Sequence, residues 1–457
     1  MAQPNVKTEV KPNFQPQPHI RTQSEGIYHG LPILPTITNP EGYTALIAGA
    51  NGISGSHILR HLSTNPSRWK HIYACSRSPP ANASQLPDYV TFVSVDLLSS
   101  SPGEIASALM QAGCRRIDYL FFFAYVLVTS EKDGGALKWE DKGLVQKNTN
   151  LLSNLLDSLP ILASETGSHL PKRITIQYGG KWYGVHLGLQ SVPMLEDPER
   201  TGTPQPPLMP GYEDKNLYYT QHAILVAFCI KHPEVTWTAG LPPYIIGSSS
   251  SSSTPQTLLY PLLVYASVQK YLGRSLDFPG SAKAWQAPQS LADASLNALQ
   301  YEWQALSPQT ANQMFNVSND DTFTWAVFWP VFAKYFGVGF TGPTDTTTSG
   351  HGNASFSFVV WANDKENQVA WKELAAAHSL QSDKWDNIGA IFGRADGALT
   401  DTGAKIMSTM KAKEYGWFGC VDSIETIMKV TKEFIELEII PNPARISLRN
   451  QGSIKDH

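Results

Sequence analysis

YTALIAGANGISGSHILRH, residues 43–61, contains an apolar strand, a glycine-rich turn and the beginning of a helix, in that order. The run Ala45–Ala48 predicts a buried parallel strand, and Gly49, Gly52 and Gly55 follow it. Such a unit binds the diphosphate of a dinucleotide, because the glycines let the backbone turn and approach the phosphates while the helix N-terminus offers N–H groups. The alternative is a tight turn without a ligand. The flanking strand and helix favour nucleotide binding.

The residues after a second apolar strand, His71–Cys75, indicate which dinucleotide binds. A site for NAD places Asp or Glu here to bind the ribose 2′-hydroxyl, whereas this chain has Ser76 and Arg77. A hydroxyl and a guanidinium suit the 2′-phosphate of NADP(H) instead. The alternative is that Arg77 is a solvated loop residue. Asp96, at the end of a third strand, is placed to contact the adenine.

Apolar strands alternate with helical segments over the first half of the chain, which predicts an α/β fold. We expect a Rossmann-type, doubly wound parallel sheet with right-handed connections, and a smaller, mostly helical C-terminal substrate lobe. The amphipathic helix 144–159 is expected to end at Pro160. The other strands are expected at Val90–Leu97, Asp118–Ala124, Arg173–Gln177 and Val235–Ile246.

The composition along the chain predicts three parts. Residues 1–25 are expected to form a disordered arm, 26–247 the NADP-binding domain, and 248–457 a substrate-binding lobe with segments returning to the first domain. The proline-rich segment 188–211 has the composition of a lid, and the serine-rich segment 248–254 that of a flexible loop. Tryptophans of the lobe are expected mostly in its core, with some lining an apolar pocket. They are Trp325, Trp329, Trp361, Trp371, Trp385 and Trp417.

Composition also limits the partners of this chain. A net charge of −4 offers no basic face for nucleic acid, and the apolar runs are shorter than the roughly 18 residues of a membrane span. Four scattered cysteines without a C-x-x-C pair indicate reduced thiols, so we expect a cytoplasmic protein. His57 and His61 lack a third ligand nearby, so no metal is expected. A homodimer is left open.

Two side chains further along fit hydride transfer to or from a carbonyl compound. Lys181 follows a strand and two glycines, and Tyr218 opens a helix. A tyrosine hydroxyl can protonate the oxygen that gains negative charge as hydride arrives, and an ammonium group can lower the tyrosine pKa and hold the ribose. The alternatives are a surface lysine and a half-buried core tyrosine. The Tyr-x-x-x-Lys pair of common short-chain dehydrogenases is absent, since His222 stands four residues after Tyr218.

The segments GGKWYGVHLG and NLYYTQ carry a resemblance to a known family. They resemble the G-G-K-H-Y-G and N-F-Y-Y segments of the progesterone 5β-reductase and iridoid synthase-like family, in its fungal branch. The resemblance covers about residues 26–442 and includes the blocks at Phe315–Pro330 and Gly416–Ser423. It implies an extended short-chain dehydrogenase fold, NADPH as cofactor, reduction of an enone, and Lys181 and Tyr218 as catalytic residues.

The resemblance also implies roles for residues around the cofactor. Asn51, Gly52 and Ile53 match the phosphate loop, within which Gly49 and Gly55 also lie. Ser76 and Arg77 match ligands of the 2′-phosphate, Asp96 and Leu97 match contacts to the adenine, Gln177 matches a residue near the nicotinamide ribose, and Ile245 matches the backbone that holds the carboxamide.

Several positions near the catalytic pair depart from the family pattern. Tyr125, Tyr178, Trp182 and His222 are therefore expected to shape the substrate pocket, and Ala223 and Leu241 are further departures. Three functions stay open. The first is an NADPH-dependent reductase of an enone or carbonyl in a small apolar metabolite; the second is a redox-neutral cyclase or isomerase with NADP(H) bound. The third is an NADP-sensing regulatory protein, against which the presence of both Lys181 and Tyr218 argues.

Overall fold

A computed structural model describes residues 22–25, 27–37, 39–80, 86–128, 139, 141–187, 191–196, 216–249, 257–343, 356–385 and 387–449. Its centre is a seven-stranded sheet in which all neighbours run parallel, in the order β12-β8-β7-β6-β3-β4-β5. These strands are β3 Tyr43–Ala48, β4 Trp69–Ser76, β5 Val90–Ser94, β6 Tyr119–Phe122, β7 Arg173–Gln177, β8 Thr236–Leu241 and β12 Gln313–Asn316. The predicted doubly wound sheet is confirmed.

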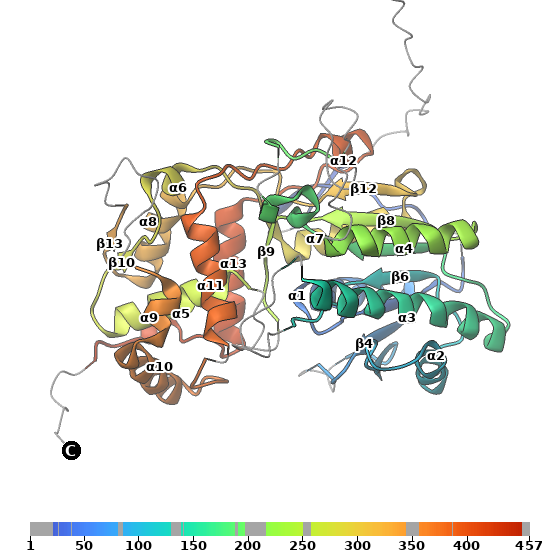
Figure 1. The fold of residues 1–457 in the computed structure, drawn as a ribbon, viewed down its shortest axis with the longest axis horizontal. Coiled ribbons are helices and arrows are strands. Elements are labelled where there is room, and N and C mark those ends of the chain that lie inside the picture. The colour runs from blue at the N-terminus through green and yellow to red at the C-terminus, as the bar shows by residue number, and fades with distance from the viewer. Residues whose placement is uncertain are drawn as a thin grey trace, which may run out of the picture.

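Helices cover both faces of this sheet (Figure 1). Ala45 and Ile47 of β3 share one apolar cluster with α1 and α7, whereas Leu46 and Ala48 share another with α2, α3 and α4. Successive strand residues point to opposite faces, so both faces of the central strand must be apolar. The helices are α1 Ile53–Leu62, α2 Pro102–Gln111, α3 Lys142–Thr166, α4 Leu217–Lys231 and α7 Ala294–Leu306.

A mostly helical lobe lies beside the sheet layer, on the left of Figure 1. Five of its tryptophans are buried as expected for a core, and Trp385 is partly buried. Strand β9 Tyr244–Ile246 pairs with β11 Leu291–Asp293, and β10 Leu276–Asp277 pairs with β13 Phe340–Thr341. The later helices are α5 Leu259–Tyr271, α6 Ala282–Gln286, α8 Trp325–Phe336, α9 Phe358–Asn363, α10 Lys365–His378, α11 Ile388–Thr400, α12 Met410–Glu414 and α13 Ser423–Glu436.

Four sequence expectations differ from the structure. Helix α3 continues through Pro160 to Thr166, because its buried face continues across the proline with Leu159 and Leu162 and outweighs one lost hydrogen bond. The expected strand 235–246 is split at Pro242 and Pro243 into β8 and β9, since proline has no N–H to donate within a sheet. The strand expected at 90–97 ends at Ser94 and that expected at 118–124 ends at Phe122, where the chain turns into the loops beneath the cavity described below.

Two pairings between strands were not predicted from the sequence. Strand β1 Thr22–Glu25 pairs antiparallel with β2 Tyr28–Pro32, so the last residues of the segment expected to be disordered form a strand. Segments 1–21, 188–190, 197–211 and 250–254 lie outside the described residues. Strand β12 and helix α7, both after residue 248, complete the sheet layer. The proposed division at residue 247 stays a prediction.

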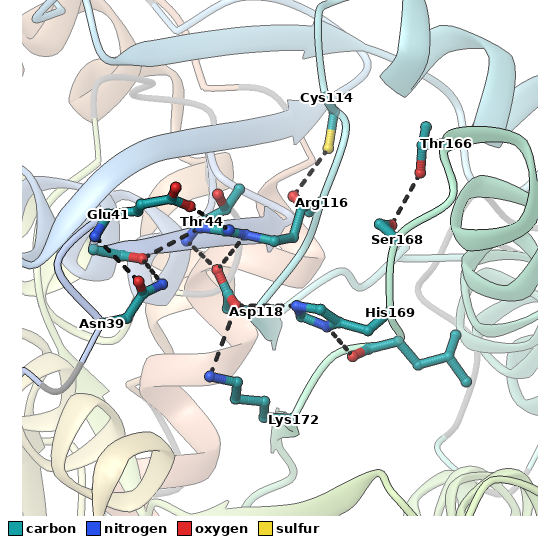
Figure 2. A network of polar contacts seen from close by, with 12 residues as sticks. Asn39, Glu41, Thr44, Cys114, Arg116, Asp118, Thr166, Ser168, His169 and Lys172 are labelled. Carbon is teal, nitrogen blue, oxygen red and sulfur yellow. Dashed lines mark hydrogen bonds and ion pairs between the residues drawn. The ribbon is translucent and has the colours of Figure 1, made fainter.

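The buried carboxylate of Asp118 lies at the amino ends of the strands, opposite the glycine turn at their carboxyl ends. Asp118, whose side chain is 1% exposed, accepts a hydrogen bond from the Thr44 amide at 2.8 Å and from Arg116 Nε at 3.1 Å, and lies 3.5 Å from His169 Nε2 (Figure 2). These contacts join the amino ends of β3 and β6 to the loop before β7. Because a buried carboxylate is costly without such donors, the network holds these ends in register.

Glu302 of α7 forms a second buried network and accounts for one histidine of the pair considered as metal ligands. It accepts hydrogen bonds from Trp69 Nε1 at 2.7 Å and Arg68 Nη1 at 3.3 Å, and lies 2.6 Å from His61 Nε2. Burial alone would raise the pKa of Glu302, but the hydrogen bonds from His61 and Trp69 and the charge of Arg68 lower it overall. His61 therefore has a structural partner that ties α1 to α7.

Candidate active site

A cavity of about 960 Å³ opens at the carboxyl ends of the parallel strands, between the sheet layer and the helical lobe. It lies where the strand order reverses between β3 and β6, the usual ligand site of an open α/β sheet. All predicted site residues except Trp182 and His222 line it: Gly49, Asn51, Gly52, Ile53, Gly55, Ser76, Arg77, Asp96, Leu97, Tyr125, Gln177, Tyr178, Lys181, Tyr218 and Ile245.

The glycine turn has the shape that a dinucleotide needs. Gly49 has φ +82°, and a Cβ there would lie 2.7 Å from the amide nitrogen of Ala124. A Cβ on Gly55 would lie 2.1 Å from the carbonyl oxygen of Gly49, so only glycine lets α1 begin this close to β3. No side chain caps the N-terminus of α1, where Gly52 is the cap residue. The N–H groups of the turn itself, from Gly49 to Gly52, donate within the protein, whereas those of the first residues of α1, from Ile53 to Gly55, remain available to phosphate oxygens.

Neighbouring strand ends complete the expected cofactor site. The Asn51 amide donates to Ser76 Oγ at 3.2 Å, and Asn51 Nδ2 donates to the carbonyl of Ser78 at 2.6 Å. The Oδ1 atom of Asn51 is buried without a partner among the described residues, so it can accept a hydrogen bond from a ligand. Arg77 is exposed at the rim, and Asp96 Oδ1 accepts from the Leu98 amide at 3.0 Å. This donor and acceptor set fits a dinucleotide.

Asn216 joins the two predicted catalytic residues. As the N-cap of α4 it accepts a hydrogen bond from the Tyr218 amide at 3.0 Å, and its Nδ2 donates to the carbonyl of Lys181 at 2.7 Å. Asn216 is fully buried, so both hydrogen bonds are shielded from water. A Cβ on Gly179 would lie 3.1 Å from the Tyr218 hydroxyl, which shows how closely this hydroxyl approaches the turn that carries Lys181.

Trp139 forms part of the cavity wall, and its position there was not predicted from the sequence. Lys181 Nζ lies 4.0 Å from the centroid of the Trp139 ring, which also stacks on Tyr125 at 5.8 Å and meets Tyr218 edge-on at 5.1 Å. A cation over an indole face is favourable and keeps the ammonium near the tyrosine. Trp139 stands in a stretch without apolar periodicity, so no local signal pointed to it. Aromatic rings therefore enclose the predicted catalytic pair.

The tyrosine hydroxyls of the cavity stay protonated near neutral pH. Burial raises the pKa of Tyr218, the neighbouring Tyr125 raises it further, and the charge of Arg394 opposes the increase. Burial likewise raises the pKa of Tyr125 to about 12, again opposed by Arg394. Tyr218 can thus act as a hydrogen-bond donor and a general acid.

Trp182 and His222 lie behind the cavity wall, which corrects their expected place in the substrate pocket. Trp182 is 6% exposed and stacks on Tyr178 at 5.4 Å, and His222 Nδ1 lies 3.3 Å from the Tyr178 hydroxyl. Burial lowers the pKa of His222 to about 4, so the imidazole is neutral at pH 7. The turn Gly180–Tyr183 directs Trp182 into the core, and only Tyr178 of this group lines the cavity.

Two further tyrosines act as supports. The Tyr219 hydroxyl donates to the carbonyl of Trp182 at 2.6 Å, away from the cavity. The Tyr301 hydroxyl donates to Gln177 Oε1 at 3.0 Å, and a Cβ on Gly240 would lie 2.2 Å from the Tyr301 ring. Because position 240 is glycine, Tyr301 of α7 can approach β8 closely enough to hold the side-chain amide of Gln177, which is expected beside the nicotinamide ribose.

The helical lobe supplies the opposite wall. Arg394 of α11 lines the cavity together with Ser290, Lys405 and Met407. None of these residues follows a motif, and a cation on an amphipathic helix gives no sequence signal. The six tryptophans of the lobe do not line the cavity, so the expectation that some would do so is wrong. Helices α8, α9 and α10 direct four of them into the core of the lobe, Trp385 packs against that core, and Trp417 packs in a separate cluster with Trp303 and Phe315.

The described residues hold no group of three or more His, Cys, Asp and Glu arranged for a metal ion. The other histidine considered as a ligand, His57, is buried with Nδ1 2.8 Å from the carbonyl of Ile53. Within the same described part of the chain, no helix has both the length and the apolar character to cross a membrane.

Comparisons with known proteins agree with this geometry. The family model described as "PRISE-like Rossmann-fold domain" matches residues 45–405. The chain is 29% identical to 3-oxo-Delta(4,5)-steroid 5-beta-reductase of Arabidopsis thaliana, over 87% of this chain and 93% of the relative. It is 28% identical to an (S)-8-oxocitronellyl enol synthase of Nepeta cataria (88% and 95%) and 26% identical to the short chain dehydrogenase gsfE of Penicillium aethiopicum (87% and 99%).

Solved structures share the fold at low identity. The terminal R domain of the myxalamid biosynthetic pathway has a TM-score of 0.53 at 14% identity, covering 90% of this chain and 94% of that domain. The enzyme WbmG of Bordetella bronchiseptica, in complex with NAD and UDP, has a TM-score of 0.51 at 13% identity, covering 88% and 96%.

The glycine turn yields a test with a matched control. Gly55→Ala places a Cβ against the Gly49 carbonyl, so we expect a loss of about 1–3 kcal/mol in the stability of the ligand-free protein. A Cβ on Gly52 would meet the Gly49 carbonyl only at 3.5 Å, so Gly52→Ala should leave that stability unchanged. Both variants should weaken dinucleotide binding, measured by calorimetry beside thermal unfolding. Equal melting temperatures for the two variants, or full affinity in Gly52→Ala, would contradict this assignment.

Proposed function

We propose, on the premise that this chain belongs to the family of PRISE-like Rossmann-fold domains, that it is an NADPH-dependent reductase of an activated C=C bond or a carbonyl in a largely apolar metabolite. The observation that carries the proposal is the Asn216 link, which holds Lys181 and Tyr218 together in the cavity that the glycine turn enters. Relatives that cover most of the chain are named as a steroid reductase and as enol synthases, which supports the assignment.

Each residue has a defined task in this reaction. NADPH, when bound along Gly49–Gly55 with its 2′-phosphate at Ser76 and Arg77, supplies a hydride to the substrate. The Tyr218 hydroxyl donates a hydrogen bond to the substrate carbonyl and so stabilises the negative charge that develops on its oxygen. The Lys181 ammonium adds positive charge on the same side. A proton from solvent then completes the reduction of the double bond.

The aromatic walls support these steps. Tyr125, Trp139 and Tyr178 exclude water, which strengthens the hydrogen bond from Tyr218 to the oxygen. Gln177, fixed by Tyr301, is placed beside the expected nicotinamide ribose. Trp182 and His222 act through Tyr178 and are supporting residues.

The redox-neutral alternative loses part of its basis. It rested on unusual residues near the catalytic pair, yet Trp182 and His222 lie behind the wall and Leu241 is fully buried. Ala223 is exposed on α4. Among these departures Tyr125 and Tyr178 line the cavity, so the pocket differs from the family pattern at fewer positions than the sequence suggested.

Turnover separates the reductase from a cyclase or isomerase. Incubated with an enone and NADPH, the protein should oxidise one NADPH for each product molecule, and the product should carry two additional hydrogen atoms. The measurements are the absorbance of reduced nicotinamide and the mass of the product. A product isomeric with the substrate, formed with NADP⁺ and without consumption of NADPH, would support the redox-neutral function instead.

Arg77 should determine the choice of cofactor. Arg77→Ala removes a charge-assisted contact to the 2′-phosphate, worth about 1.5–3 kcal/mol, and should weaken NADPH binding roughly tenfold to a hundredfold. NADH lacks this phosphate, so its affinity should stay almost unchanged. Calorimetric titration of both cofactors is the measurement. Equal losses for the two would refute the role of Arg77.

The adjacent tyrosines of α4 provide a matched pair for the catalytic role. Tyr218→Phe removes the hydroxyl that faces the cavity and should raise the barrier by about 2–4 kcal/mol. Tyr219→Phe removes the hydrogen bond to the Trp182 carbonyl and should cost about 1 kcal/mol of stability with little change in kcat. Steady-state kinetics and thermal unfolding test both. An active Tyr218→Phe beside an inactive Tyr219→Phe would reverse the two roles.

A further inference from the structure

Arg394 is a cation in the cavity wall that has no carboxylate partner among the residues that the structure describes. Its Nε atom is buried and has no hydrogen-bond partner among the described residues, and the guanidinium makes no ion pair with any carboxylate in that part of the chain. Lys405, in the same wall, differs because it pairs with Asp401. A buried donor without an acceptor is costly, so a half-buried cation of this kind in a cavity wall is typical of a binding site for an anion.

The position of Arg394 indicates which anion this is. Arg394 lines the same cavity as Tyr125 and Tyr218, and its charge opposes the increase that burial causes in the pKa of both hydroxyls, so it lies within electrostatic range of the place where the substrate carbonyl would meet Tyr218. Phosphate groups of a dinucleotide have a separate site at the uncapped N-terminus of α1 and at Arg77. Arg394 comes from α11 of the helical lobe, which forms the cavity wall opposite the sheet layer.

We propose that Arg394 binds a carboxylate on the substrate, so that the substrate is an apolar enone or ketone with an acidic group close to the reacting carbonyl. The inference rests on the proposed function, in that Tyr218 is taken to bind this carbonyl. Guanidinium and carboxylate match in planar, two-point geometry. With Tyr218 on the carbonyl and Arg394 on the carboxylate, the substrate is held at two places and its C=C bond has one orientation toward the cofactor.

Arg394 neither gains nor loses electrons or protons in the proposed reaction. In the reduction of an acid such as β-benzoylacrylate, the C=C bond gains a hydride from NADPH and a proton, and the products are β-benzoylpropionate and NADP⁺. The carboxylate stays ionised throughout. Removing Arg394 should therefore raise KM for the acid without changing kcat for a neutral ester.

The test uses binding, so that it is independent of turnover. Protein saturated with NADP⁺ is titrated by calorimetry with β-benzoylpropionate and with its methyl ester. Wild-type protein should bind the acid about ten- to a hundredfold more tightly than the ester. Arg394→Gln should remove this preference, Arg394→Lys should retain part of it, and Lys405→Gln, which removes an already paired cation, should leave it intact. NADP⁺ affinity and melting temperature are measured for each variant.

Three binding results would overturn the proposal: equal binding of acid and ester by the wild type, no binding of the acid, or a preference that survives in full in Arg394→Gln. A fall in kcat with the ester in that variant would also overturn it, because Arg394 would then act on the reacting carbonyl. If β-benzoylacrylate is not reduced while the acid preference still depends on Arg394, the reductase function fails and the carboxylate site stands.

Discussion

The contact between Gly55 and the Gly49 carbonyl is the constraint on which the site depends. It lets α1 begin directly on the end of β3, because any side chain at position 55 would collide with the turn. The turn then lies beside the end of β4, where the Asn51 amide meets Ser76, and beside Ala124 after β6. One backbone approach therefore sets the positions of three strand ends around the cavity.

A second constraint is the side chain of Asn216, which positions the two proposed catalytic residues. Lys181 and Tyr218 lie on different elements, the turn after β7 and the first residues of α4, and sequence distance alone does not hold them together. Asn216 bonds to the backbone of both, so the pair is positioned through the main chain while both side chains stay directed at the ligand. The Tyr219 hydroxyl fixes the same turn from behind through the Trp182 carbonyl.

Features that depend on residues close together in the sequence could be predicted, whereas features that depend on contacts between distant residues could not. The strand, glycine turn and helix at residues 43–61 are local, so their pattern sufficed, and an Asn before a helix is a cap signal that could have identified Asn216. Trp139 and Arg394 reach the cavity only through tertiary folding, and neither has a local signature. Trp182 and His222 were misplaced because nearness to Lys181 and Tyr218 in sequence does not give the direction of a side chain.

The cavity is asymmetric in charge, and this asymmetry limits what can bind. Its sheet side presents the first N–H groups of α1 and Arg77, its aromatic walls are Tyr125, Trp139, Tyr178 and Tyr218, and its lobe side adds Arg394. An entirely apolar ligand would leave the buried Nε atom of Arg394 without a hydrogen-bond acceptor, whereas one acidic group would provide it. Selection of an acidic substrate thus depends on Arg394, whereas stabilisation of the negative charge on the substrate oxygen depends on Tyr218.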